Sequence, residues 1–326
     1  MIELAFFIIV FIIYNFISGF LFLEFLKKKK NYEFTFAEYG LCGIFTLTFI
    51  SFLTYLAFPL NYTVNFVLFF LFTLLFFIKF NFQKIKKIFI NREFLILFLI
   101  SFAVTFIMSL KLKLHEDYQF YHYPYIVNVI SEKIIFGLSN IQPQYAWNLS
   151  WLNYSSLYNF PYLGSKGIIL SNSIFYFYVI YFFLERTFNY KKISKLSEIY
   201  IFSLTVYVII KFSRISEHGY DFPANILLLI SFYYFIRLFE DKKIEYFILV
   251  ILFCSLSFIV KVTAFIAPFI VLLILIYLYI FQKKILSKIN FLIFTIIFFY
   301  IVWFIHQIII SGCLFPHFYF TCIDLV

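Results

Sequence analysis

The sequence predicts an all-α protein that crosses a membrane about ten times. Of its 326 residues, 64% are hydrophobic and only 13% are charged, and the mean hydropathy is +0.97. A soluble domain of this size buries only about 75% of the surface of its unfolded chain, so it has no room for so much apolar area. Long apolar runs separated by short basic clusters are typical of polytopic helical membrane proteins.

The first apolar run, residues 3–26, is followed by the basic cluster of residues 27–30 and has no basic residue before it. A cleaved signal peptide has the opposite order, so we expect a retained span with its N-terminus outside. About 20 apolar residues cross a bilayer. Further spans are expected at 36–58, 63–82, 93–110, 167–186, 197–212, 223–240, 245–260, 262–281 and 290–310. The stretch 245–281 is too long for one helix and predicts a tight hairpin around Lys261.

The basic residues support this arrangement of spans. If residues 27–30 lie inside, strict alternation places nineteen of the 26 Lys and Arg residues in inner segments and the other seven in outer ones. This bias fits the positive-inside rule and predicts a multi-pass protein of the cytoplasmic (inner) membrane. We expect one transmembrane domain, residues 1–326. It would comprise four spans within 1–110, a large outer loop at 111–165, and the remaining spans within 166–326.

The net charge of +10 comes from the same basic segments, which stand in short clusters between apolar runs. We therefore expect the lipid bilayer as a partner and no nucleic acid. The four cysteines show no metal-binding spacing. Cys313 and Cys322 share the last outer segment, where they either form a disulfide or remain thiols.

Ionisable side chains gather in the segments predicted to be outside. The first group is His115, Glu116, Asp117 and His122, directly after the fourth span. After them, Pro124 suits the first turn of a helix, and helical spacing over 123–134 predicts a helix lying in the membrane interface. Two interpretations stay open: a solvated loop with a surface helix, or a carboxylate held over a cleft that lipid reaches. The expected apolar face is formed by Tyr123, Ile126, Val127, Ile130 and Ile134.

A second group stands before the span at 223–240 and contains Arg214, Glu217, His218 and Asp221. Asp221 either caps the following helix or forms a second wall of the same site.

Two further outer positions carry positive or titratable groups. Lys261 is either an anchor that reaches the interface or a recessed partner for a phosphate group. His317 lies in the last outer segment, beside Gly312 and Pro316.

Short motifs resemble a known family. DYQFYHYP, residues 117–124, resembles the D-x-x-x-Y-H-x-P stretch of bacterial multi-spanning proteins grouped with the GT-C superfamily of membrane glycosyltransferases. Asp221 and Pro223 are similar to the entry of a later helix in that family, and Lys261 stands in a similar K-x-[ST]-A turn. The similar motifs run in the same order from about residue 110 to 320. The other matching positions are Gly137, Leu138, Asn140, Asn148, Ser150, Trp151, Ser311, Gly312, Phe315 and Pro316.

The resemblance implies a GT-C-like transferase that takes a sugar from a polyprenyl phosphate on the outer face of the membrane. The acceptor would be a hydroxyl group of a glycan, a lipid or a protein. The family's acidic residue in the first large outer loop corresponds to Asp117. That loop follows the fourth predicted span here, whereas in most GT-C enzymes it follows the first.

The chemistry of glycosyl transfer agrees with these positions. A base must take the proton of the acceptor hydroxyl, and positive charge or hydrogen-bond donors must stabilise the departing phosphate. We expect Asp117 and Asp221 to be catalytic. The residues expected to bind substrate are Glu116, His122, Arg214, His218, Lys261 and His317.

Several alternatives stay open. A Mg²⁺ or Mn²⁺ ion shared by the two aspartates is conceivable, although we expect no fixed metal site. A lipid or oligosaccharide transporter or flippase should carry charges near the centres of its spans, and apart from Lys261 the spans have almost none. A polysaccharide polymerase or ligase, or a non-catalytic subunit of polysaccharide assembly, is also compatible with the sequence.

Overall fold

The computed structural model describes residues 1–26, 34–79, 82–89, 92–110, 113–114, 117–147, 149–188, 195–211, 217–241, 243–315 and 319–322. Each of the ten apolar segments expected from the sequence contains one apolar helix among its described residues. Seven of these helices are long and apolar enough to cross a membrane, and three are apolar but shorter. The chain is therefore a multi-pass helical membrane protein. The long helices are α1 (Ile2–Leu26), α2 (Phe36–Ala57), α5 (Arg92–Leu110), α8 (Ser165–Phe188), α11 (Asp221–Asp241), α13 (Ile266–Phe281) and α14 (Lys283–Ser311).

The shorter apolar helices are α3 (Tyr62–Ile78), α9 (Leu196–Ile210) and α12 (Ile244–Val260). The expected hairpin around Lys261 is confirmed, because α12 ends directly before that residue and the 3-10 turn η4 (Val262–Ala264) leads into α13. Two α-helices were not predicted: α4 (Phe82–Phe89) occupies a segment expected to be an inner loop, and α7 (Ser150–Ser156) lies within the expected outer loop. The remaining elements are β1 (Lys113–Leu114), η1 (Tyr118–His122), α6 (Tyr123–Ser131), η2 (Leu138–Asn140), η3 (Pro143–Ala146), β2 (Glu217–His218) and η5 (Tyr319–Thr321).

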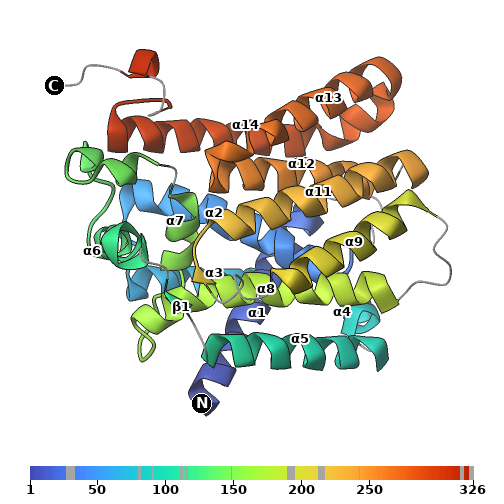
Figure 1. Ribbon diagram of the computed structural model, residues 1–326, viewed down its shortest axis with the longest axis horizontal. Helices are drawn as coiled ribbons and strands as arrows, with labels where there is room; N and C mark the ends of the chain where they lie inside the picture. Colours follow the sequence, from blue (N-terminus) through green and yellow to red (C-terminus); the bar gives the residue numbers. More distant parts are fainter. Residues whose placement is uncertain are drawn as a thin grey trace.

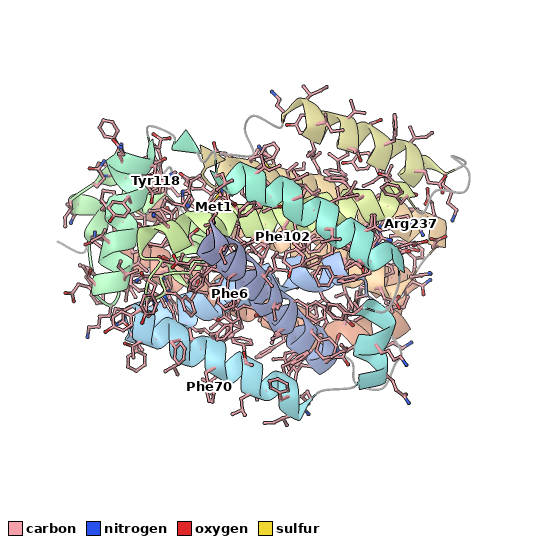
Figure 2. The ribbon with its side chains drawn as sticks, turned by 90° about the horizontal axis from the view of Figure 1, so that it is seen from below. Met1, Phe6, Phe70, Phe102, Tyr118 and Arg237 are labelled. Atoms are coloured by element: carbon pink, nitrogen blue, oxygen red, sulfur yellow. A yellow bond between two sulfur atoms is a disulfide. The ribbon has the colours of Figure 1, made fainter. Side chains whose placement is uncertain are left out.

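The helices run roughly along the longest axis of the molecule (Figure 1). One end carries α6, α7, β1 and the N-terminus, and α4 lies toward the opposite end; we call these the α6 end and the α4 end. Figure 2 shows the same separation, with Tyr118 near one end and Arg237 near the other. The described segments that were predicted to share a side of the membrane therefore gather at the same end.

The centre and the rim of the bundle differ in burial. On α12 every residue from Phe247 to Val260 is buried, and on α8 83% of the residues in its most apolar 18-residue stretch are buried. In contrast, only 28% of the residues in the most apolar 18-residue stretch of α5, and likewise of α13, are buried. Large apolar side chains such as Phe70 on α3 are more than half exposed. In a membrane protein these exposed apolar faces contact lipid.

Helices α1 and α2 pack with their backbones in direct contact. A Cβ atom added to Gly19 would stand 1.8 Å from the carbonyl oxygen of Tyr39, and one added to Gly43 would stand 1.8 Å from that of Asn15. Small residues at such crossings are characteristic of helix pairs in membranes, where close van der Waals packing drives association.

Replacing Gly19 with alanine should therefore force the two helices apart. We expect the Gly19→Ala protein to lose about 1–3 kcal/mol of stability, the usual cost of overpacking, and to melt earlier in detergent micelles. The matched control is Gly219→Ala, whose added methyl group would meet no atom within 4 Å. Equal melting temperatures for the two variants would contradict this packing.

Helix α7 enters the interior of the bundle although its sequence, SWLNYSS, is polar. All seven residues are buried. A closed ring of hydrogen bonds holds α7 and the residues after it to α1: Asn15 donates to the hydroxyl of Tyr158 (2.7 Å), which donates to Tyr154 (2.6 Å), which donates to Asn15 (3.0 Å). Buried polar groups need such partners, so this ring explains how a polar segment lies inside an apolar bundle.

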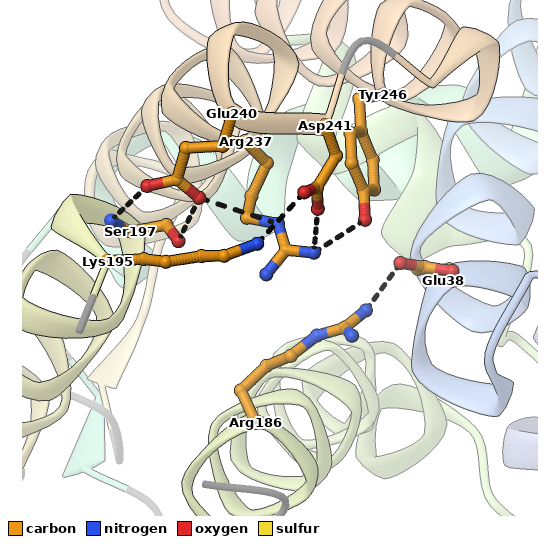
Figure 3. A network of polar contacts seen from close by, with 8 residues as sticks. All are labelled: Glu38, Arg186, Lys195, Ser197, Arg237, Glu240, Asp241 and Tyr246. Carbon is orange, nitrogen blue, oxygen red and sulfur yellow. Dashed lines mark hydrogen bonds and ion pairs between the residues drawn. The ribbon is translucent and has the colours of Figure 1, made fainter. Parts of the chain in front are cut away.

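Polar contacts join α2, α8, α9, α11 and α12 near the α4 end (Figure 3). Glu38 of α2 forms an ion pair with Arg186 of α8 at 2.6 Å and also accepts a hydrogen bond from Tyr234 of α11. Close by, Arg237 pairs with Asp241, which also pairs with Lys195 at 2.9 Å. The network ties the ends of helices that are far apart in the sequence.

The helix expected after His122 is present as α6, with Pro124 in its first turn. Of the expected apolar face, Ile126 and Ile134 are buried in the protein, whereas Tyr123 (40% exposed) and Val127 (37% exposed) point away from the protein interior. Tyr125 and Val129 are buried as well. The amide nitrogen of Leu60, in the segment between α2 and α3, donates to the carbonyl oxygen of Val129 at 2.8 Å and holds α6 against that segment.

The last described segment is closed by a disulfide between Cys313 and Cys322, which settles the alternative that the sequence left open. The ring of Phe315 inside this loop lies 5.5 Å from the ring of Phe304 on α14. The disulfide loop therefore packs on the α6 end of α14.

Candidate functional site

Two short parallel strands join the first large outer loop to the segment before α11. Lys113 pairs with Glu217 and Leu114 pairs with His218. The hydrogen bond from Asn172 Nδ2 on α8 to the carbonyl oxygen of Gly219 (2.9 Å) fixes the residue after β2, and Trp151 Nε1 on α7 donates to the side-chain oxygen of the same asparagine (2.7 Å). The strands bring together two of the sequence segments that were expected to form one site.

A cluster of histidines and tyrosines lies directly beside the strands. His122 and His218 have ring centroids 6.1 Å apart, and they are 4% and 0% exposed. Tyr118 packs on His218 with ring centroids at 5.1 Å, while Tyr121 and Tyr220 pack on His122 at 4.5 and 5.3 Å. We call these five residues the His–Tyr cluster. Its two histidines were expected to bind substrate, and the structure places both below the surface.

Burial lowers the pKa of His218 to about 3, and the neighbouring His122 acts in the same direction. His218 is therefore neutral near pH 7. A neutral, fully buried imidazole has no charge to offer a phosphate group, so His218 supports the walls of the site.

This burial predicts a pH-dependent loss of stability. The unfolded chain protonates His218 at its ordinary pKa of 6.5, whereas the folded chain resists protonation down to about pH 3. The stability is therefore complete above about pH 6.5 and falls as the pH drops toward 3, by at most about 1.4 kcal/mol per pH unit.

The measurement is the melting temperature of the purified protein between pH 7.5 and 5. The control is His218→Phe, because neither ring nitrogen of His218 bonds to a described residue and phenylalanine keeps the ring contact. We expect the wild type to lose more stability on acidification than this variant. If the melting temperatures of the wild type and the variant fall in parallel as the pH is lowered, folding does not lower the pKa of His218.

Asp221 and Lys261 form an ion pair at the α6 end, with Lys261 Nζ 2.6 Å from Asp221 Oδ1. Asp221 begins α11, and Lys261 occupies the turn between α12 and α13. Their side chains are 66% and 29% exposed, so the pair contributes little to stability. Lys261 Nζ also lies 5.9 Å from the ring centre of Tyr220, which connects the pair to the His–Tyr cluster.

Together with burial, Asp117 and Asp221 both raise the pKa of the same two phenol groups, those of Tyr121 and Tyr220. The hydroxyls of Tyr121 and Tyr220 lie 3.3 Å apart. Burial is the largest cause of the raised pKa of Tyr121; the hydrogen bond with Tyr220 opposes it, and the charges of Asp117 and Asp221 add to it. The pKa of Tyr220 is also raised, first by burial and then by Tyr121 and both aspartates. Both phenols therefore keep their protons at neutral pH.

The structure thus brings together five of the eight predicted site residues: Asp117, His122, His218, Asp221 and Lys261. The other three, Glu116, Arg214 and His317, lie outside the described residues. Tyr121 and Tyr220 were missed as site residues. Tyr121 stands inside the motif that suggested the site, and Tyr220 directly precedes Asp221. The chain contains 27 tyrosines, so a tyrosine beside a candidate residue is not by itself a sign of a site.

No group of three or more His, Cys, Asp and Glu side chains within the described part of the chain is arranged to hold a metal ion. The site that these residues form contains an exposed carboxylate paired with a lysine, a second partly exposed carboxylate, and two protonated phenols. This combination provides a proton acceptor, a positive charge and hydrogen-bond donors.

Fold and site together define a multi-pass helical membrane protein with a polar site assembled by loops at one end of its helix bundle. A family model described as "Domain of unknown function (DUF8201)" matches residues 1–326, and the chain belongs to this family. No curated protein and no solved structure matches the chain.

Proposed function

We propose that the protein is a membrane glycosyltransferase of the GT-C type. It would transfer a sugar from a polyprenyl-phosphate-linked donor to an acceptor hydroxyl at the outer face of the cytoplasmic membrane. The observation that supports this most is the meeting of Asp117, Asp221 and Lys261 around the hydroxyls of Tyr121 and Tyr220. The order of short motifs that resemble the GT-C superfamily adds to it.

The proposed reaction is a single displacement. The acceptor oxygen forms a bond to the anomeric carbon while the bond between that carbon and the phosphate oxygen breaks, which inverts the anomeric centre. Asp117 takes the acceptor proton, and the polyprenyl phosphate leaves with the bonding electrons. Lys261, oriented by Asp221, stabilises the phosphate charge together with the hydroxyl groups of Tyr121 and Tyr220.

The orientation of the bundle belongs to this proposal, with the α6 end outside and the N-terminus on that side. Ile141, which is 75% exposed near α6, and Lys86, which is exposed on α4, are suitable reporters. A cysteine at position 141 should react with an impermeant maleimide in intact cells, and one at position 86 only after permeabilisation. The native cysteines give little background, because Cys42 and Cys254 are buried and the other two are disulfide-bonded. The reverse pattern would overturn the orientation.

The experiment that tests the activity follows the sugar donor in cells. A transferase acting outside uses donor from the outer leaflet, so deleting the gene should make one polyprenyl-phosphate sugar accumulate there. Treating intact cells with impermeant periodate, followed by mass spectrometry of the lipids, distinguishes the leaflets. Accumulation in the inner leaflet would point to a flippase, and unchanged polyprenyl-phosphate sugars would exclude both activities.

A further inference from the structure

The second half of α7 fastens this short, polar helix to the bundle. Tyr154 donates to Asn15 of α1 at 3.0 Å, and Ser155 Oγ lies 2.7 Å from Ser171 Oγ of α8. The carbonyl oxygen of Ser156 accepts a hydrogen bond from a buried asparagine of α3 at 2.8 Å. Hydrogen bonds are strong in such a dry interior, so α7 has a fixed place relative to α1, α3 and α8.

The first half of α7 bonds to the segments that carry the candidate site. Ser150, at its start, donates to the carbonyl oxygen of Ile259 at 2.5 Å. Ile259 stands in the last turn of α12, two residues before Lys261, and carbonyl groups in the last turn of a helix lack their usual partner four residues further along. Both Ser150 and Ile259 are 0% exposed. Because a buried carbonyl group needs a donor, the Ser150 hydroxyl holds the end of α12 and with it the backbone of Lys261.

Trp151, the next residue, reaches the segment before Asp221 through α8. Its indole nitrogen donates to Asn172 Oδ1 (2.7 Å), and Asn172 Nδ2 donates to the carbonyl oxygen of Gly219 (2.9 Å), two residues before Asp221. An indole N–H only donates, so it meets the amide oxygen of Asn172 and leaves the amide nitrogen to donate to Gly219. Each partner of the ion pair is therefore held through the carbonyl group two residues before it.

Asn153 connects α7 to the third segment of the site. Its Oδ1 accepts a hydrogen bond from the hydroxyl of Tyr125 on α6 at 3.1 Å, and both residues are 1% exposed. Helix α6 directly continues η1, which begins next to Asp117 and contains Tyr121. The bond to Tyr125 therefore holds the segment that carries Asp117.

We propose that α7 sets the relative positions of the three charged residues of the candidate site. Ser150, Trp151 and Asn153 are its positioning residues, and each acts through the group to which it bonds. They lie within one helical turn, whereas the segments that they hold come from three separate parts of the chain. This role explains why a polar helix is buried where an apolar one would pack without needing partners. The inference rests on the proposed function only for its effect on transfer.

The placement of the ion pair can be measured without a transfer assay. A water-soluble carbodiimide joins a carboxylate to an amine that is in contact with it, so it should link Asp221 to Lys261, whose charged atoms are 2.6 Å apart. The yield is measured by mass spectrometry of peptides from the purified protein in nanodiscs. We expect Ser150→Ala and Trp151→Phe each to lower it about threefold or more, in line with the net value of one hydrogen bond.

The matched control is Ser156→Ala, the same change in the same helix at an equally buried residue. The hydroxyl that it removes donates to the carbonyl oxygen of Leu152 within α7 (2.8 Å), so the yield should equal that of the wild type. Ser150→Thr keeps a hydroxyl group and should restore most of the yield lost in Ser150→Ala. If Ser150→Ala does not fold, Trp151→Phe, which keeps an aromatic ring, carries the test.

A transfer assay then relates this geometry to the proposed function. Ser150→Ala and Trp151→Phe should lower kcat by about 10–100-fold, because small misplacements of reacting groups are costly, and should change KM for the donor far less. Tyr125→Phe removes the bond that holds the segment of Asp117. It should lower kcat to a similar extent and leave the yield of the link between Asp221 and Lys261 unchanged.

The outcomes separate the role of α7 from the activity. Lower link yields in a protein whose wild type transfers no sugar would keep the positioning role and reject the transferase. Yields in Ser150→Ala and Trp151→Phe equal to that of Ser156→Ala, or no link in the wild type, would overturn the positioning role. So would a loss confined to Ser257→Ala, because Ser257 Oγ donates to the carbonyl oxygen of Ala224 (2.8 Å) and joins α12 directly to α11.

Discussion

Replacing Asp117 with asparagine is expected to lower the rate of sugar transfer by about 10²–10⁴-fold, the usual contribution of a positioned general base. Asparagine has nearly the same shape but does not accept the proton of the acceptor hydroxyl. Asp221→Asn should also cause a large loss, because it removes the carboxylate that holds Lys261 Nζ at 2.6 Å. The measurement is transfer by purified protein in liposomes under saturating donor.

Both variants should insert and melt like the parent, since neither aspartate is buried. The matched control is Glu132→Gln, which removes one exposed carboxylate at the end of α6 and should keep the rate within about twofold. If Asp117→Asn and Asp221→Asn also stay within that range, the two aspartates are not catalytic.

The largest loss of stability is expected at the α4 end, from Glu38→Ala. The Glu38 side chain is 4% exposed and receives hydrogen bonds from Arg186, from Tyr234 and from the amide nitrogen of Thr35, which it caps at 2.7 Å. Removing it takes away the buried carboxylate that pairs with the Arg186 guanidinium at 2.6 Å. Breaking a buried pair in this way costs about 3–5 kcal/mol.

The same network contains its own control. Lys195 pairs with Asp241 at a similar distance, but its side chain is 43% exposed, so Lys195→Ala should cost no more than about 1 kcal/mol. Unfolding of both variants in micelles measures the contrast. Similar stabilities would mean that Glu38 and Arg186 are not coupled as Figure 3 shows them.

The helical segments could be predicted from the sequence because each is an apolar run long enough to read without tertiary information. The hairpin at Lys261 followed from the same reasoning, since 37 residues exceed one span and suit two. In contrast, α4 was missed because its amphipathic pattern is short and resembles a basic loop. The rotation of α6 depends on packing and on a hydrogen bond from Leu60, between α2 and α3, which no spacing within one segment reveals.

The candidate site was predicted in its members but not in its arrangement. Sequence reasoning placed Asp117, Asp221 and Lys261 on one side of the membrane, and the structure brings them around Tyr121 and Tyr220. The exposure of the site residues was harder to predict than their position along the chain. Histidines in loops are usually solvated, but the strand pairing and the aromatic neighbours of His218 bury it completely. Such burial arises from segments about 100 residues apart, so a local pattern carries no sign of it.

The pairing of Leu114 with His218 has a consequence for how the family can vary. Asp117 stands three residues after Leu114, and Asp221 stands three residues after His218, the residue paired with Leu114 across the two strands. Both aspartates are therefore separated from the strand pair by the same number of residues. Insertions before Lys113 or before Glu217 leave that offset intact, and the preceding segments are free to lengthen or shorten. A single residue gained or lost between either strand and its aspartate would instead shift one carboxylate against the other. The pairing of these two short strands thus allows the lengths of the preceding segments to vary without changing the relative position of the two aspartates.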